Sequence, residues 1–190
     1  MYTVAMSSLD IPNFEIAQVD PNDVARYLDE GKLDLHPEVI NVLDENLRDG
    51  AARLYVALAD EIPAGQIALK MTGPNNEDVC AALELEPDEV APQTGFLQVP
   101  GQFRGKGIAT ALVRRVCDDV ADLDFRTIFG KYAAANTPME RLFTHLGYSF
   151  TDLEWLLPDH QRNAQGEYDE PALVNMRIVY KRLGQSATAS

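Results

Sequence analysis

The length of 190 residues fits one domain, and 46% hydrophobic with 24% charged residues is typical of a globular protein. A formal net charge of −14 excludes the basic surface that nucleic-acid phosphates or anionic membranes require. No apolar run approaches the ~20 residues of a membrane span. Two cysteines without a CxxC spacing fit a reduced, cytoplasmic protein. The three histidines lie far apart, so no metal site is expected.

The N-terminal half predicts a strand, two helices and a β-hairpin, after a loose lead-in over residues 1–13. Alternating apolar residues indicate the strands, and proline and glycine mark the helix ends. Pro63 is expected in the turn of the hairpin. The predicted ranges are 14–19 for the strand, 20–31 and 36–48 for the helices, and 52–59 with 64–71 for the hairpin.

An acidic segment follows at residues 77–93, which contain six carboxylates. No lysine or arginine occurs between Lys70 and Arg104, and Cys80 to Leu83 suggest a single helical turn. A run of carboxylates is usually a solvated face. The alternative is that Glu84 or Glu86 binds or deprotonates an ammonium substrate.

The C-terminal half alternates strands and helices, which implies a parallel crossover unit. Thr137, Pro138 and Glu140 predict a capping box with Thr137 as the N-cap. A polar loop is expected at 158–171 and a frayed tail at 184–190. The predicted elements are strands at 94–99, 125–129, 148–157 and 172–182, and helices at 105–120 and 137–146.

A glycine-rich turn, Gln102–Ala109, lies between the strand at 94–99 and its helix. Pro100 interrupts strand pairing just before it, because proline has no N–H. N–H groups at a helix start have no intrahelical partner and lie at the positive end of the helix dipole. With Arg104 and Lys106 they make a seat for phosphate. The alternative is an ordinary strand-to-helix turn with two solvated cations.

Two motifs resemble the GNAT acetyltransferase superfamily. Residues 102–107, Q-F-R-G-K-G, match the family signature Q/R-x-x-G-x-G/A and follow the usual Leu97-x-Val99 strand end. Residues 136–148 resemble its second landmark, an Asn that opens a helix ending in Gly and an aromatic residue. The resemblance implies one α/β (α+β) domain over 1–190 with the acyl-CoA N-acyltransferase fold. That fold has a mixed, mostly antiparallel central sheet with a splayed parallel pair and helices on both faces.

The resemblance also implies an N-acetyltransferase that moves an acetyl group from acetyl-CoA, as co-substrate, to a primary amine by direct attack. No metal takes part in this chemistry. The implied partner is an amine-bearing small molecule or peptide, and a homodimer is compatible with the family. The implied cofactor-binding residues are Leu97, Gln98, Val99, Gln102, Phe103, Arg104, Gly105, Lys106, Gly107, Ile108, Ala109, Asn136 and Phe143.

The chain departs from the family pattern at its acid and its base. Family members often carry a tyrosine acid four residues before the second-landmark glycine, where this chain has Phe143. Tyr132 is a candidate substitute, or simply a core aromatic. The strand at 94–99 has no carboxylate base, which leaves Glu84, Glu86 or another group. Asn136 either contacts the cofactor arm or caps its helix.

These departures leave two other functions open. One is a non-catalytic acyl-CoA-binding or sensor domain of the same fold. The other is a partner-binding domain in which the glycine turn is vestigial. Binding of acetyl-CoA separates the second from the rest, and turnover with an amine separates the enzyme from the sensor.

Overall fold

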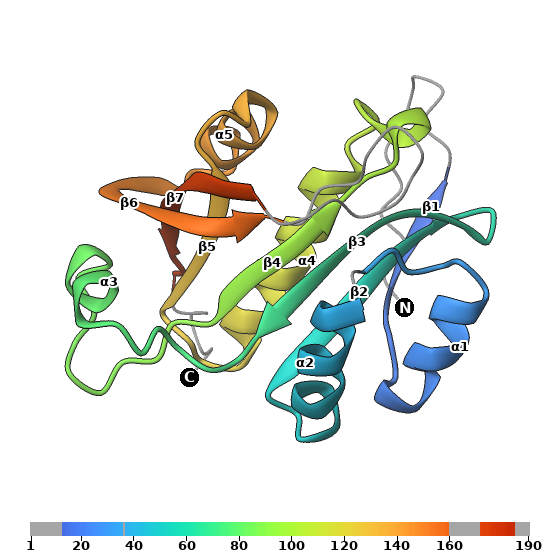
Figure 1. Cartoon of the computed structure of the whole chain (residues 1–190), viewed down its shortest axis with the longest axis horizontal. Coiled ribbons are helices and arrows are strands. Elements are labelled where there is room, and N and C mark those ends of the chain that lie inside the picture. Colours follow the sequence, from blue (N-terminus) through green and yellow to red (C-terminus); the bar gives the residue numbers. More distant parts are fainter. Residues whose placement is uncertain (1–12, 36, 160–171, 185–190) are drawn as a thin grey trace, which may run out of the picture.

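The computed structural model describes residues 13–35, 37–159 and 172–184. Its strands form one sheet in the order β1-β2-β3-β4-β5-β7-β6, with helices on both faces (Figure 1). The strands are β1 (Phe14–Gln18), β2 (Ala52–Ala59), β3 (Ile62–Lys70), β4 (Gln93–Gln98), β5 (Thr127–Ala133), β6 (Ser149–Asp159) and β7 (Ala172–Arg182). The helices are α1 (Val24–Asp29), α2 (Pro37–Arg48), α3 (Glu77–Ala82), α4 (Ile108–Asp122) and α5 (Thr137–His145), with 3-10 turns η1 (Pro21–Asp23) and η2 (Gly101–Phe103).

The sheet is mostly antiparallel, and in the described part of the chain β4 and β5 are its parallel pair. Their pairing covers two residue pairs, Gln93 with Phe129 and Thr94 with Gly130, after which the strands diverge. The predicted α/β fold, with a mostly antiparallel sheet and one splayed parallel pair, is confirmed.

Three apolar clusters hold the helices to the sheet. The largest packs α4 and α5 against one face, with Leu112, Val116 and Ile128 fully buried. The second packs α1 and α2 on the other face over β2 and β3. A third cluster joins α3 to β5 and β7 through Val79 and Phe129. The burial of these side chains follows the helical and alternating periods of the sequence.

The β2–β3 hairpin differs from its prediction. Asp60 and Glu61 both have positive φ, 50° and 66°, and form the two-residue turn, a geometry that matches the twist of the flanking strands. Pro63 lies within β3 opposite Leu58, beside a shift in register after Ala57. The expectation that Pro63 lies in the turn is therefore wrong. A proline fits there because a register irregularity leaves room for a residue without an N–H.

The start of α5 also differs by one residue from the prediction. Asn136 is the N-cap, and its side chain accepts a hydrogen bond of 3.2 Å from the backbone N–H of Met139. Thr137 is instead the first helical residue. Asn and Thr are both good caps, and sequence spacing alone did not separate them. Most of the predicted lead-in at 1–13, loop at 158–171 and tail at 184–190 lies outside the described residues. Residues 158 and 159, predicted to begin the loop, instead belong to β6, which pairs with β7 up to Asp159.

Candidate active site

The opening between β4 and β5 begins at a tight contact. Thr94 donates a hydrogen bond of 3.2 Å from Oγ1 to the Phe129 carbonyl. A Cβ at residue 130 would lie 2.7 Å from the same Oγ1, so Gly130 permits the strands to approach this closely. Beyond Thr94, the edge of β4 that faces β5 has no strand partner among the described residues. Its backbone groups are therefore available to an extended ligand.

A β-bulge lies within the same strand, on the edge of β4 that pairs with β3. Phe96 and Leu97 together oppose the single residue Ile67, between the pairs that β4 makes with Gln66 and Ala68. Phe96 has φ of 53° and is 46% exposed. A bulge bends its strand and re-aims backbone groups, and non-glycine residues rarely adopt positive φ. Sequence reasoning missed it: Gly95 stands directly before Phe96, but a glycine within a strand does not by itself fix the register that creates a bulge.

The predicted glycine turn follows β4 and leads into α4. Gly105 and Gly107 have φ of 74° and 80°, and no atom lies within 4 Å of a Cβ built on either residue. The first helical hydrogen bond runs from Ala111 N–H to the Gly107 carbonyl. No described residue accepts a hydrogen bond from the N–H groups of residues 105–110. These unpaired donors at a helix start fit the phosphate seat that the sequence predicts.

Several contacts hold the turn in place. Ile108 is 1% exposed, and a Cβ on Gly65 of β3 would lie 3.0 Å from its Cγ2, so Gly65 lets the start of α4 lie against the sheet. Arg104 donates from Nε to the Val99 carbonyl at 3.1 Å. Lys106 lies with Nζ 5.6 Å from the centre of the Phe103 ring.

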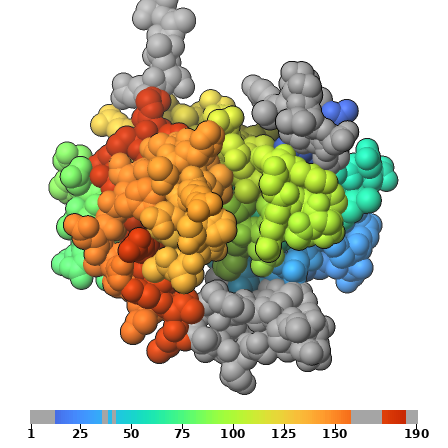
Figure 2. All heavy atoms as spheres, turned by 90° about the horizontal axis from the view of Figure 1, so that it is seen from above, coloured from blue at the N-terminus to red at the C-terminus, as the bar shows by residue number. Residues whose placement is uncertain are grey.

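The charge around the turn is positive, although the whole chain is acidic. Residues 90–117 contain no Asp or Glu and carry four basic residues. Figure 2 shows the segment that contains the turn, in lime green, on the surface beside the orange segment of α5 and β6. The predicted residues Leu97 to Ala109 thus run without a break from the unpaired part of β4 to the start of α4.

Phe143 of α5 packs against Tyr132 of β5. Phe143 is 3% exposed, with its ring centre 5.7 Å from that of Tyr132 and 4.8 Å from that of Tyr148. Tyr132 Oη is buried and makes no hydrogen bond of standard geometry among the described residues. Arg177 pairs with Tyr132 in the sheet, and Glu154 and then the Tyr132 hydroxyl raise the pKa of its guanidinium, so this cation lies close to Oη. A buried hydroxyl without a well-formed hydrogen bond costs free energy, so this group is a candidate for a catalytic role.

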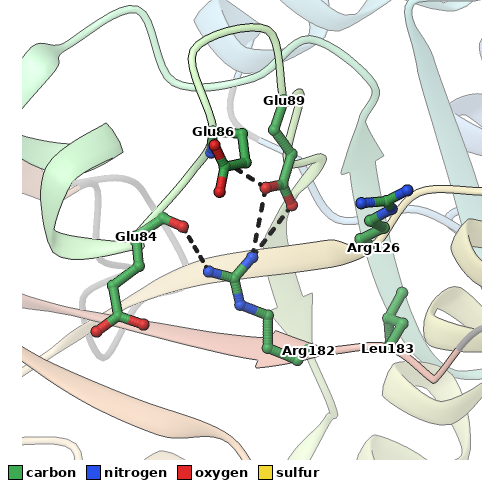
Figure 3. A pocket seen from close by; sticks show the side chains of 6 residues that line it. All are labelled: Glu84, Glu86, Glu89, Arg126, Arg182 and Leu183. Carbon is green, nitrogen blue, oxygen red and sulfur yellow. Dashed lines mark hydrogen bonds and ion pairs between the residues drawn. The ribbon is translucent and has the colours of Figure 1, made fainter.

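Glu84 and Glu86 lie at the other end of β4, away from the turn. Arg182 donates to the Leu83 and Glu84 carbonyls at 2.8 and 2.7 Å and to Glu89 Oε1 at 3.1 Å (Figure 3). The structure does not bring the two predicted carboxylates together with residues 102–109, and their role as base stays a prediction. A cavity of about 390 Å³ here is lined by Glu84, Glu86, Glu89, Arg126, Arg182 and Leu183.

The described residues contain no group of three His, Cys, Asp or Glu side chains that could hold a metal ion. Within the same residues, no helix is both long and apolar enough to cross a bilayer.

A parallel strand pair that opens beside a phosphate-seating turn can hold one extended ligand that ends in a phosphate. The model of the acetyltransferase (GNAT) family matches residues 21–148. The chain belongs to this family, whose members transfer acetyl groups from acetyl-CoA. No curated protein sequence matches the chain.

Solved structures with similar folds are themselves acetyltransferases. NAA60 of Arabidopsis thaliana, in complex with a bisubstrate analogue, is 16% identical with a TM-score of 0.62, covering 91% of this chain and 99% of that one. The putative acetyltransferase yncA of Salmonella typhimurium, with its cofactor acetyl-CoA, is 13% identical with a TM-score of 0.59, covering 94% and 98%. A GNAT acetyltransferase of Elizabethkingia anophelis with acetyl-CoA bound is 16% identical with a TM-score of 0.57, covering 90% and 99%.

Proposed function

We propose that this chain transfers an acetyl group from acetyl-CoA to a primary amine by direct attack within a ternary complex. The observation that carries the proposal is the continuity of the opening: the unpaired edge of β4 leads straight into the free N–H groups of residues 105–110. One extended ligand with a diphosphate at one end fits both.

Different residues would bind the different parts of acetyl-CoA. The N–H groups of residues 105–110 would bind the diphosphate, assisted by the side chains of Arg104 and Lys106. The pantetheine arm would lie along Leu97 to Val99, where β4 has no strand partner on its β5 side. The N-cap position of Asn136 occupies its side chain in the described structure, so any contact with the arm would require the Asn136 amide to donate through Nδ2.

The chemistry moves three protons. The ammonium of the acceptor first loses a proton to solvent or to a base. Its nitrogen then attacks the thioester carbonyl carbon, forming a C–N bond while the C–S bond breaks, and it loses a second proton as the amide forms. The third proton is the one that the departing thiolate gains. Backbone N–H groups of the bulged strand near Leu97 would stabilise the negative charge that develops on the carbonyl oxygen. Tyr132 would donate a proton to the departing thiolate, in place of the tyrosine that Phe143 replaces.

A second function, an acyl-CoA sensor without catalysis, is favoured by the absence of the usual acid and base. Phe143 cannot donate a proton, and β4 from Gln93 to Gln98 carries no carboxylate. A sensor would keep the cofactor contacts and need neither group. A thiolate is a fair leaving group even without an acid, so we place the enzyme first.

Two measurements test these functions. Calorimetric titration with acetyl-CoA should show binding at micromolar concentrations for both the enzyme and the sensor. Release of free thiol from acetyl-CoA should then depend on an added primary amine if the chain is an enzyme. Tight cofactor binding without turnover across a broad amine panel would support the sensor, and the absence of binding would exclude both.

A further inference from the structure

Lys131 lies where the opening between β4 and β5 begins. It is the first β5 residue beyond the last parallel pair, Thr94 with Gly130. Alternate residues of a strand share a face, so its side chain lies on the same face as Phe129, opposite α4. Trp155 of β6 lies on this face too, and Lys131 Nζ is 5.1 Å from the centre of its indole ring.

The neighbouring strands present little bulk beside Lys131. Beyond that last pair the two strands diverge, and the next residue of β4, Gly95, pairs with Ala68 of β3. No atom lies within 4 Å of a Cβ built on Gly95. On this face, β4 therefore carries no side chain at the residue that follows its last pair with β5.

The charge of Lys131 lacks a described counterion. Burial and the nearby charge of Lys70 hold the pKa of Lys131 below its usual value. Lys70 lies on the same face, because it pairs with Gln93 and Gln93 pairs with Phe129. Among residues 13–35, 37–159 and 172–184, no carboxylate forms an ion pair with either lysine. In a chain with 30 acidic and 16 basic residues, a half-buried ammonium without a carboxylate partner is costly and unexpected.

We propose that Lys131, held over Trp155, binds an anionic group of the acceptor, so that the substrate is an amine that also carries a carboxylate or a phosphate. The proposal rests on the proposed acetyl transfer. An anionic group would restore the counterion that the ammonium lacks, and the indole face would orient the lysine side chain. The overall negative charge alone suggests a cationic acceptor, but the charge that acts on Lys131 at this point is the positive charge of Lys70.

The first experiment compares acceptors that differ only in the anionic group. L-amino acids are tested against their own amides, and O-phosphoethanolamine against ethanolamine, with thiol release as the readout. The ratio of kcat/KM for the anionic acceptor to that for its neutral partner should exceed one in the native chain. It should fall about ten- to a hundredfold in Lys131→Gln, since hydrogen bonds to charged groups have this strength. Lys131→Arg should recover part of it.

Lys181→Gln is the matched control. Lys181 also lies near an aromatic ring, with Nζ 5.9 Å from the centre of the Tyr148 ring, but it donates to the Leu146 carbonyl away from the opening. This variant should leave the ratio unchanged. An equal fall in both variants, or an unchanged ratio in Lys131→Gln, would overturn the proposal, as would a native preference for the neutral partners.

A second readout does not need turnover. Reductive methylation followed by mass spectrometry measures how readily each lysine of the acetyl-CoA-loaded chain reacts. The preferred anionic acceptor, or in the absence of turnover each L-amino acid and O-phosphoethanolamine in turn, should slow the modification of Lys131 and leave Lys181 unaffected. Protection without turnover would support the anion site and count against catalysis. Turnover of neutral amines without protection of Lys131 would support catalysis and count against the anion site.

Discussion

Thr94 Oγ1 lies 2.7 Å from the position that a Cβ on Gly130 would take, at the last pair that joins β4 to β5. Because residue 130 has no side chain, β4 and β5 can pair at this point, and they diverge directly beyond it. Adding a single methyl group at residue 130 would therefore change the spacing of β4 and β5 where the opening begins.

Gly130→Ala should destabilise the fold by about 1–3 kcal/mol, the usual cost of adding bulk to a packed core. Thr94→Ala should cost about 1 kcal/mol through the lost hydrogen bond to the Phe129 carbonyl. The double variant should be more stable than the sum of the two predicts, because it lacks the Oγ1 that the new methyl would meet. Urea unfolding of the four proteins measures this coupling, and strict additivity would contradict it.

Gly107→Trp should weaken acetyl-CoA binding more than tenfold, or about 1.4 kcal/mol, because a side chain there intrudes on the free N–H groups. Gly50→Trp is the matched control. Gly50 has φ of 71° and no atom within 4 Å of a Cβ, close to the values for Gly107, but it follows α2. Both variants should lose similar stability from left-handed strain, and calorimetry should find weaker binding only in the first. Equal affinities would remove Gly107 from the site.

The parts of the fold that periodicity and glycine marked were predictable from the sequence. The turn before α4 requires positive φ at residues 105 and 107. Glycine adopts that conformation readily, so the two glycines mark the turn in the sequence. The Phe96 bulge could not be predicted, since its cause is the register between β3 and β4, a relationship between distant segments.

Long-range contacts also decide the remaining differences. Glu84 and Glu86 follow the chain closely before β4, which suggested a place near the acceptor. Arg182, some ninety residues later, instead holds that loop at the other end of the strand. Lys131 did carry a signal, as the one charged residue in the strand T-I-F-G-K-Y-A. Its meaning depended on which side chains share its face.

Tyr132→Phe should slow turnover about a hundredfold if the hydroxyl donates a proton to the thiolate, with the affinity for acetyl-CoA unchanged. Because Tyr132 Oη makes no hydrogen bond of standard geometry and its neighbour Arg177 keeps its ion pair with Glu154, removal of the hydroxyl should change the stability little. Tyr148→Phe is the control, since Tyr148 packs on the same Phe143 ring but its Oη lies 3.3 Å from Cys117 Sγ. Steady-state kinetics on both variants decide the role, and an equal rate in Tyr132→Phe and the native chain would exclude it.

Glu89 should make the stability of the chain depend on pH. Burial raises its pKa, but hydrogen bonds from Thr127 and the Glu86 backbone N–H, and the charge of Arg182, outweigh burial and hold the pKa below its usual 4.5. A carboxylate with a lowered folded pKa contributes stability above its unfolded pKa, and the contribution is lost as the pH falls through the folded value. Glu89→Gln should therefore lower the free energy of unfolding at pH 7 by about 1–3 kcal/mol.

The difference in the free energy of unfolding between Glu89→Gln and the native chain should shrink as the pH falls below 4.5. Glu89 then becomes protonated and loses its charge, whereas glutamine is neutral at every pH. Glu86→Gln is the control at the same cavity, because Glu86 is exposed and contributes its backbone N–H rather than its carboxylate. That variant should match the native stability at every pH. Urea unfolding between pH 3 and pH 7 measures both, and a stability difference that stays constant with pH would show that the Glu89 charge is not its cause. Since Glu84 and Glu86 lie away from the turn, thiol release by Glu84→Gln and Glu86→Gln should equal that of the native chain, and a large loss would instead restore them as candidates for the base.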